Sequence, residues 1–309
     1  MIETNILKAI DFKPVSVEDK QIYNDYFWKE SDRGCEVSFA NLFLWGEQNI
    51  FVGNDYILLL SKFGEHRVYP YPLGESDKKP LIDRIIADSK QRGIPCYISG
   101  VTHSSKKLLE ELYPDKFRFD FREDSFDYVY DINDLADLPG KKYHAKRTHI
   151  NRFKEDFPDY SVESITEENA SLVLEMAEIW FAARILENTE ADYKMEKTAL
   201  KRALSNYRAL GLEGIILRAG GRILAFSMAS RMTEDTFDVH FEKAVPDAKG
   251  AYAMINCEFA RYIRNKYPSV KFLDREEDMG LEGLRKAKRS YHPHHQIEKW
   301  RAFLLEESK

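Results

Sequence analysis

The segment VKFLDREEDMGLEGLRKAKRSYHP, at residues 270–293, contains a short apolar strand, a charged loop and a basic helix in succession. In α/β folds, ligands bind at the carboxyl ends of strands, where the chain leaves the sheet. A strand that releases carboxylates and an arginine at this edge concentrates reactive charge there. The segment therefore predicts an α/β unit with a functional site in the loop at residues 274–278.

Strands and helices alternate from this segment back along the chain. Apolar patterns predict strands at residues 214–218, 222–231 and 237–241. Two further runs, at residues 50–52 and 56–60, flank a Gly-Asn-Asp turn and predict a hairpin. Strands that alternate with helices and include hairpins indicate the α/β (α+β) class with mixed sheets.

The length of 309 residues suits two domains, each large enough to bury its own core. The turn Asp137-Leu138-Pro139-Gly140 marks the join between them. We expect an N-terminal domain at residues 1–138 and a C-terminal domain at residues 139–309, the second carrying the active site.

The composition, 43% hydrophobic and 13% aromatic, indicates a globular chain. No apolar run approaches the about 20 residues needed to span a bilayer. The amino terminus lacks the basic and apolar regions of a secretory signal, so we expect a cytoplasmic protein. The net charge of -6 argues against indiscriminate nucleic-acid binding but permits a local basic groove.

The spacing of cysteines and histidines predicts no metal site. Cys35, Cys96 and Cys257 are scattered, which favours small buried thiols in a reduced protein. The histidines at residues 292–295 lack a cysteine or carboxylate at zinc-ligand spacing. The chain also has no G-x-S-x-G elbow for a serine nucleophile.

The loop of the opening segment supplies three candidate catalytic residues, Arg275, Glu276 and Asp278. A carboxylate can orient an amino group or accept a proton, and an arginine can hold phosphate or carboxylate in a fork. Arg285 and Lys288, on the helix that follows, are candidate substrate-binding cations. The alternative is that these charges only complement the dipole of that helix.

The strand before this segment adds two candidates for a catalytic pocket, His240 and Glu242. Because strand side chains alternate between faces, these two residues point to the same side. The alternative for His240 is a hydrogen-bonded histidine in the core.

A glycine turn follows the same strand and suggests a cofactor site at Lys249, Gly250 and Ala251. Backbone amides at such a turn, with the helix amino terminus, favour a phosphate. Acyltransferases of the GNAT class hold the pyrophosphate of coenzyme A in a Q/R-x-x-G-x-G/A turn. Here Asp247 and Tyr252 depart from that pattern, which weakens the evidence that the turn binds acyl-CoA. The alternative is that Gly250 only starts a helix.

A basic helix at residues 141–154 carries four candidate substrate-binding residues, Tyr143, Lys146, Arg147 and Arg152. Cations interleaved with an aromatic ring can grip the phosphates of RNA or of an anionic head group. The alternative is a solvated helix face, as most charge runs are.

The chain resembles a bacterial family named after the C-terminal domain of phosphatidylglycerol lysyltransferase. The matching motifs are SFANLFLW at residues 38–45, YHAKRTHINRF at residues 143–153 and DREEDMGLEGLRKAKRSYHP at residues 274–293. The resemblance implies two tandem GNAT-like acyltransferase domains, as in the Fem-type enzymes that add amino acids to peptidoglycan precursors.

The resemblance also implies a transferase that moves an aminoacyl group from aminoacyl-tRNA to a lipid or other amine or hydroxyl acceptor. Asp278 or Glu276 would then recognise the aminoacyl ammonium group or assist proton removal. The cations would contact tRNA phosphate (Lys146, Arg147 and Arg152) or lie near the scissile ester (Arg275 and Arg285). Without the transmembrane half of the full lysyltransferases, the chain would meet phospholipid head groups from the membrane surface.

Two alternatives remain open on the sequence. One is an acyl-CoA-dependent N-acyltransferase that uses the turn at Lys249 and Gly250. The other is a non-catalytic GNAT-like protein that binds a nucleotide, a lipid or a protein partner.

Overall fold

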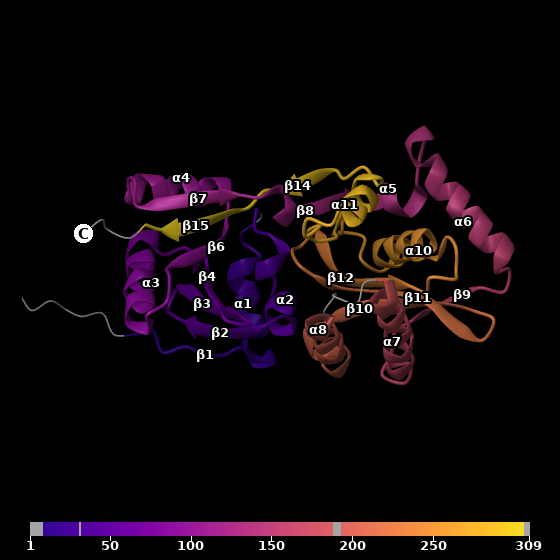
Figure 1. Cartoon of the computed structure of the whole chain (residues 1–309), viewed down its shortest axis with the longest axis horizontal. Helices are drawn as coiled ribbons and strands as arrows, with labels where there is room; N and C mark the ends of the chain where they lie inside the picture. The colour runs from indigo at the N-terminus through magenta and orange to yellow at the C-terminus, as the bar shows by residue number, and fades with distance from the viewer. Residues whose placement is uncertain (1–8, 31, 188–192, 306–309) are drawn as a thin grey trace, which may run out of the picture. The chain divides into compact units, whose positions relative to one another are not determined.

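The computed structural model in Figure 1 describes residues 9–30, 32–187 and 193–305. These residues form helices and strands in two mixed sheets, which confirms the α/β (α+β) class expected from the sequence. Among them, no helix is both long enough and apolar enough to cross a bilayer.

Contacts within the chain divide it into unit 1, residues 1–126 and 297–309, and unit 2, residues 127–296. This division differs from the expected boundary at residue 138. Strand β8 (Asp127–Asp131) pairs with a strand of unit 2, so that unit begins before the turn taken as the join. Strand β15 (Trp300–Leu304) pairs with strands of unit 1, so the end of the chain returns to the N-terminal unit.

Unit 1 contains an eight-stranded sheet of order β1-β2-β3-β4-β6-β15-β7, with β5 paired to β3 outside this path. Its other strands are β1 (Lys13–Pro14), β2 (Glu47–Val52), β3 (Tyr56–Phe63), β4 (His66–Pro70), β5 (Leu73–Gly74), β6 (Tyr97–Val101) and β7 (Phe117–Phe121). Its helices are η1 (Val17–Asp19), α1 (Lys20–Phe27), η2 (Cys35–Val37), α2 (Phe39–Leu44), α3 (Lys78–Arg92), α4 (His103–Leu112) and η3 (Glu123–Ser125). The antiparallel pairing of β2 with β3 confirms the predicted hairpin.

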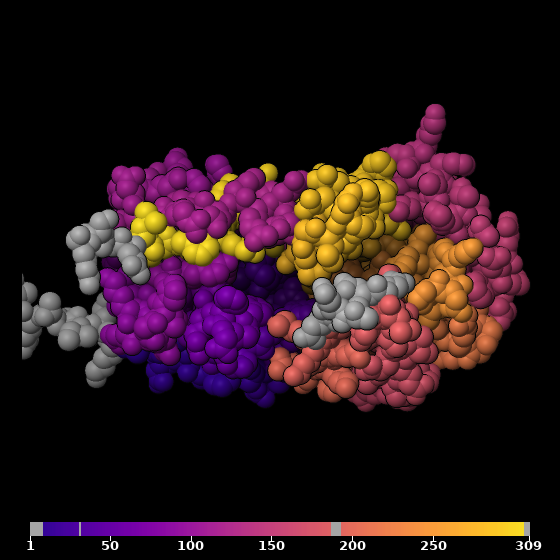
Figure 2. Space-filling model, viewed as in Figure 1, coloured from indigo at the N-terminus to yellow at the C-terminus, as the bar shows by residue number. Residues whose placement is uncertain are grey.

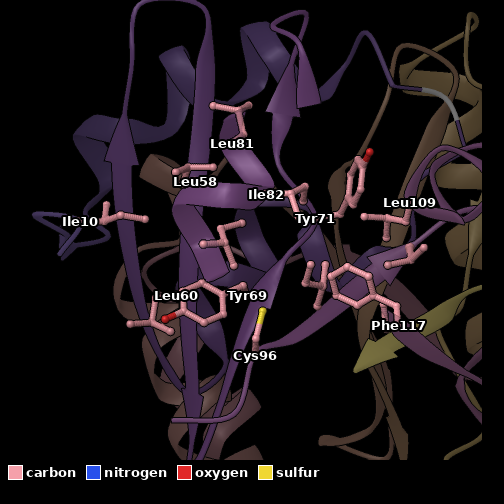
Figure 3. Packing of buried hydrophobic residues seen from close by; sticks show 14 residues of the cluster. Ile10, Leu58, Leu60, Tyr69, Tyr71, Leu81, Ile82, Cys96, Leu109 and Phe117 are labelled. Carbon is pink, nitrogen blue, oxygen red and sulfur yellow. The ribbon is translucent and has the colours of Figure 1, made fainter. Parts of the chain in front are cut away.

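Buried apolar side chains fill the core of unit 1 (Figure 3). Helix α3 contributes the residues Leu81, Ile82 and Ile85. Asp88, on the same helix, is also buried, and it accepts hydrogen bonds at 2.7 Å from the Tyr69 hydroxyl and from Arg92 Nε. The carboxylate is therefore paired, which removes most of the cost of burying it.

Unit 2 contains a seven-stranded sheet of order β14-β8-β13-β12-β11-β10-β9. Its other strands are β9 (Ser161–Ser164), β10 (Leu212–Ala219), β11 (Arg222–Arg231), β12 (Thr236–Ala244), β13 (Phe272–Asp274) and β14 (His295–Ile297). Its helices are α5 (Ile132–Asp137), η4 (Lys141–Tyr143), α6 (His144–Asp156), α7 (Ala170–Glu187), α8 (Lys194–Ser205), α9 (Tyr207–Leu210), α10 (Ala251–Lys266) and α11 (Glu282–Arg289). Strands β10, β11 and β12 confirm the three strands predicted for this half.

Helices α10 and α7 cover opposite faces of this sheet (Figure 1). Successive side chains of a strand point to opposite faces, and β12 shows this directly. Glu242 accepts a hydrogen bond of 3.2 Å from Asn256 on α10. The neighbouring Lys243 ammonium lies 3.5 Å from the ring centroid of Trp180 on α7.

Strands β12 and β13 run parallel and then diverge. Their pairing extends from Thr236 opposite Phe272 to Asp238 opposite Asp274. Beyond this point β12 continues, whereas the chain after β13 enters the loop at residues 275–281. The end of β12 therefore lies beside the charged loop, at the carboxyl ends of two parallel strands, where α/β folds bind ligands.

The substitution Gly250→Ala tests the packing at the start of α10. Gly250 has φ +85°, and an added Cβ would lie 2.3 Å from the carbonyl oxygen of His149 on α6. The substitution therefore adds a clash with backbone to the cost of a positive φ, about 1–2 kcal/mol. We expect it to lower the free energy of unfolding by roughly 3 kcal/mol or more, measured by urea denaturation.

Gly220 provides the matched control, because it also has a positive φ, +56°, but no atom within 4 Å of an added Cβ. Gly220→Ala should cost only the backbone strain of about 1–2 kcal/mol. Equal losses for the two variants would contradict the close packing of α10 on α6.

Candidate functional site

The centre of the candidate site is an ion pair across the divergence of β12 and β13. Glu242 is on β12, and Arg275 is the first residue after β13. Arg275 Nη2 donates to Glu242 Oε1 at 2.7 Å, and the two side chains are only 15% and 9% exposed. Asn256 Nδ2 donates to the other oxygen of Glu242, at 3.2 Å. A positive and a negative side chain, both shielded from solvent, are therefore in direct contact at the centre of the site.

Aromatic rings and free polar atoms surround this pair. The guanidinium carbon of Arg275 lies 5.6 Å from the ring centroid of Tyr130 and 5.1 Å from that of Tyr291. Arg275 Nη1 is buried and has no hydrogen-bond partner in the described part of the chain. The same holds for Asn256 Oδ1 and for the hydroxyl of Ser227, the cross-strand neighbour of Glu242. Buried polar atoms of this kind are uncommon in native proteins, and a bound polar group is one explanation for them.

Lys146 of α6 belongs to the same group of charges. Its ammonium donates to Ser290 Oγ at 2.6 Å and lies 3.7 Å from the ring centroid of Tyr291. Burial lowers the pKa of Lys146 to about 8, with a further lowering from the positive charge of Arg275 and an opposing effect of Glu242. The space-filling view shows the segment around α11 against α6 (Figure 2). Lys146 therefore interacts electrostatically with Arg275 and Glu242.

Asp278, expected to act in catalysis, is instead the anchor of the loop. Its buried carboxylate accepts from the Tyr128 hydroxyl at 2.7 Å, from the Gly280 N–H at 2.8 Å, and from Arg285 Nε and Nη2 at 2.7 and 2.9 Å. Burial alone would raise the pKa of Asp278, but the bonds from Arg285, Tyr128 and Gly280 outweigh it and lower the pKa to about 2. A carboxylate so occupied is a poor base, and Arg285 is equally engaged.

Two residues expected to bind substrate also hold the structure together. The Lys288 ammonium donates to the carbonyl oxygens of residues 275, 276 and 277 at 2.5, 3.0 and 2.5 Å, which uses all of its protons. Tyr143 is fully buried, and its hydroxyl donates to the carbonyl oxygen of Tyr291 at 2.8 Å. Neither side chain is available to a substrate in this arrangement.

His240 lies behind the site as a hydrogen-bonded buried histidine, which is the alternative interpretation of this residue. Its Nε2 is 2.8 Å from Ser230 Oγ, and its Nδ1 is 3.5 Å from both Asp238 Oδ2 and Glu276 Oε1. Ligand atoms of Asp238, His240 and Glu276 lie within 4.8 Å of one another, a spacing that a metal ion could use. Glu276 is 22% exposed and links this group to the loop.

The glycine turn has a structural explanation. Gly250 adopts a positive φ and packs against the His149 carbonyl, so a side chain has no room there. Lys249 is exposed, and the Ala251 N–H donates to the Ala248 carbonyl oxygen at 3.1 Å. This arrangement favours the interpretation of Gly250 as a helix-starting residue over a pyrophosphate turn.

The remaining cations of α6 face different surroundings. Arg147 Nη1 donates to the carbonyl oxygens of Leu138 and Gly140 at 2.5 and 2.7 Å, which holds the turn between α5 and α6. Arg152 is exposed, and its nearest carboxylate oxygen, on Asp156, is 3.8 Å away. The role of Arg152 in phosphate binding stays a prediction.

The sequence analysis missed four residues that surround the ion pair: Ser227, Asn256, Tyr130 and Tyr291. Tyr291 lies in the opening segment and could have been noted as a large side chain beside the basic helix. The other three come from separate elements, and no local pattern connects them with the loop.

The substitution Asp278→Asn should destabilise unit 2. The lowering of the pKa from 3.8 to about 2 corresponds to roughly 2 kcal/mol of stability. Because the folded-state pKa is the lower one, this contribution is complete above about pH 4 and is lost as the pH falls through about 2. Urea denaturation at pH 7, 4 and 2 should show a difference between wild type and variant that shrinks only at the lowest pH.

Glu282→Gln is the control, because the Glu282 side chain is 79% exposed and pairs with Lys286 on the surface. Its effect should stay below about 0.5 kcal/mol at every pH. A similar loss in both variants would refute the anchoring role of Asp278.

Known proteins are similar to this chain in sequence and in fold. The family model described as phosphatidylglycerol lysyltransferase, C-terminal, matches residues 29–303. No curated protein matches the chain. A solved conserved protein of unknown function from Bacteroides thetaiotaomicron VPI-5482 is 37% identical with a TM-score of 0.89, and the match covers 96% of this chain and 100% of that one.

Two more distant structures share the fold. The C-terminal domain of a putative lysylphosphatidylglycerol synthetase from Agrobacterium fabrum is 13% identical, with a TM-score of 0.66 over 94% of this chain and 93% of that one. L-PGS from Bacillus licheniformis is 15% identical, with a TM-score of 0.66 over 96% and 94%. The tandem GNAT-like fold is thereby confirmed, and the chain belongs to the family of the phosphatidylglycerol lysyltransferase C-terminal domain.

Proposed function

We propose that this protein is an aminoacyl transferase that moves an aminoacyl group from aminoacyl-tRNA to a lipid or other amine or hydroxyl acceptor. The observation that carries the proposal is the ion pair of Glu242 and Arg275 at the divergence of two parallel strands, with free polar atoms around it. Membership of a family named for a lysyltransferase supports the class of reaction.

The reaction is a direct transfer between two oxygen or nitrogen atoms. The nitrogen or oxygen of the acceptor forms a bond to the ester carbonyl carbon, and the bond from that carbon to the ribose oxygen of tRNA breaks. The proton of the acceptor ends on the ribose oxygen. No covalent enzyme intermediate is needed, which agrees with the raised pKa, about 11, that burial gives to Cys96 and Cys257.

Arg275 and Glu242 would act on different groups of the substrate, the reacting carbonyl oxygen and the aminoacyl ammonium. The free Nη1 of Arg275 can donate to the oxygen on which negative charge develops, a stabilisation that is strong where solvent is excluded. Glu242 would hold Arg275 in place and attract the ammonium of the aminoacyl group. Glu276, partly exposed in the same loop, remains a second carboxylate for that ammonium.

Lys146 would carry the proton. An amine with a pKa of about 8 exists in both protonation states near neutral pH, so it can take a proton from the acceptor and return it to the ribose oxygen. Its place beside Arg275 and Tyr291 supports this role over that of a distant phosphate contact.

Glu242→Gln should reduce transfer from a matched aminoacyl-tRNA by roughly 100-fold, because Arg275 loses the carboxylate that orients it. The assay is the release of labelled aminoacyl groups from tRNA to lipid extract or to amine acceptors. Circular dichroism would verify that the variant folds. Lys271→Ala is the control, since Lys271 is 70% exposed and lies at the opposite end of β13. Unchanged transfer in Glu242→Gln would remove this pair from the site.

The pH dependence of transfer tests Lys146. If neutral Lys146 accepts the proton, the rate should rise with pH to a plateau above about 8. Lys146→Ala should lower the plateau and abolish this inflection, whereas a role in phosphate binding would weaken tRNA affinity and leave the inflection in place.

Calorimetric titration with acyl-CoA distinguishes the proposed aminoacyl transferase from the main alternative, an acyl-CoA-dependent N-acyltransferase. The structural role of Gly250 leads us to expect no stoichiometric binding signal. A clear signal together with acyl transfer from acyl-CoA would favour the N-acyltransferase, and the absence of transfer from either donor would favour a binding protein.

A further inference from the structure

Unit 2 contains a cavity of about 240 Å³ between α5, α6 and α10 that the proposed transfer does not use. Polar side chains dominate its lining, among them His144, Arg147, Thr148, Asn151, Lys154 and Arg261. The first five belong to α6 and Arg261 to α10. The cavity is therefore a polar space between two helices, apart from Glu242 and Arg275, which do not line it.

The polar lining residues of α6 lie on one face of the helix. Positions 144 and 148, and 147 and 151, are four apart, and positions 148, 151 and 154 are successively three apart. The basic residues of α6 therefore lie on different faces of the helix. One face lines the cavity, and Arg152 lies outside it.

Two cations of the lining, Arg147 and Lys154, have no carboxylate partner in the described part of the chain, whereas Arg261 is paired with Glu258 at 2.8 Å. Arg147 donates only to the carbonyl oxygens of Leu138 and Gly140. Within the described residues, no carboxylate lies within 4.0 Å of the cationic groups of Arg147 or Lys154. The one carboxylate of the lining, Asp137, is held by Arg264 through two bonds of 2.6 and 2.9 Å.

We infer that this cavity binds a phosphate group. Arg147 offers a planar guanidinium and Lys154 a mobile ammonium, the two cations that proteins use for phosphate. The side chain of Asn151, which makes no hydrogen bond within the described chain, adds a neutral donor. The volume of about 240 Å³ is large enough for a phosphate group.

Two sources could supply the same chemistry, a small phosphorylated molecule or a phosphate of a nucleic-acid backbone. The inference concerns binding alone and stands whether or not Glu242 and Arg275 catalyse transfer. Its failure is therefore distinguishable from a failure of the proposed function, because binding is measured without any transfer reaction.

The experiment titrates the full chain with inorganic phosphate and glycerol phosphate by calorimetry, and with uncharged tRNA by fluorescence anisotropy at several salt concentrations. Lys154→Ala is the test variant, because the residue is exposed and has no ion pair whose loss would unfold the protein. Lys271→Ala is the control for the small phosphates and for tRNA, because Lys271 is 70% exposed and does not line the cavity.

For small phosphates, we expect Lys154→Ala to weaken binding at least fivefold and Lys271→Ala to change it less than twofold. For tRNA, we expect Lys154→Ala to weaken binding and to reduce the slope of log affinity against log salt by about 1. An effect confined to tRNA would assign the phosphate to a nucleic-acid backbone, and one confined to small phosphates would assign it to a metabolite. Equal effects of test and control variants, or no binding of any probe, would overturn the inference.

Discussion

The candidate site depends on the carboxylate of Asp278. This buried carboxylate accepts hydrogen bonds from the Tyr128 hydroxyl, from the Gly280 amide and from Nε and Nη2 of Arg285. Lys288 completes the arrangement by binding three successive carbonyl oxygens of the loop. Because both groups lie inside the protein, water does not compete for these bonds. The loop is therefore held in one conformation, and Arg275 is directed toward Glu242.

The parallel pairing of β12 and β13 supplies the rest of the geometry. Pairing ends at Asp238 and Asp274, so β12 continues alone while the chain after β13 turns away. Alternation along β12 then sends Glu242 toward α10 and Lys243 toward α7. A strand one residue out of register would exchange these two side chains and bring a positive charge to Arg275. The ion pair is thus a consequence of sheet register.

Much of the fold and part of the site could be predicted from local patterns. Strands β10, β11 and β12 and the hairpin of β2 with β3 followed from alternation and turn residues, which act within a few positions. Arg275 and Glu276 follow the end of a strand and Glu242 lies on a strand, as the sequence predicted, and their catalytic roles are proposals. Asp278 is a charged residue of the same loop, but its carboxylate is buried and accepts one of its four hydrogen bonds from Tyr128, which lies 150 residues away.

The sequence by itself determined the α/β class and the presence of a charged loop before a basic helix, because each is a local property of composition and pattern. Only the tertiary structure decided which charges are buried. Lys146, Arg147 and Arg152 are near neighbours in the sequence, yet they meet an ion pair, two carbonyl oxygens and solvent, respectively. The tertiary structure also shows that β15, near the end of the chain, belongs to the sheet of unit 1. Burial and partners arise from contacts between distant segments, and these contacts decide whether a charge holds the fold or remains free to meet a substrate.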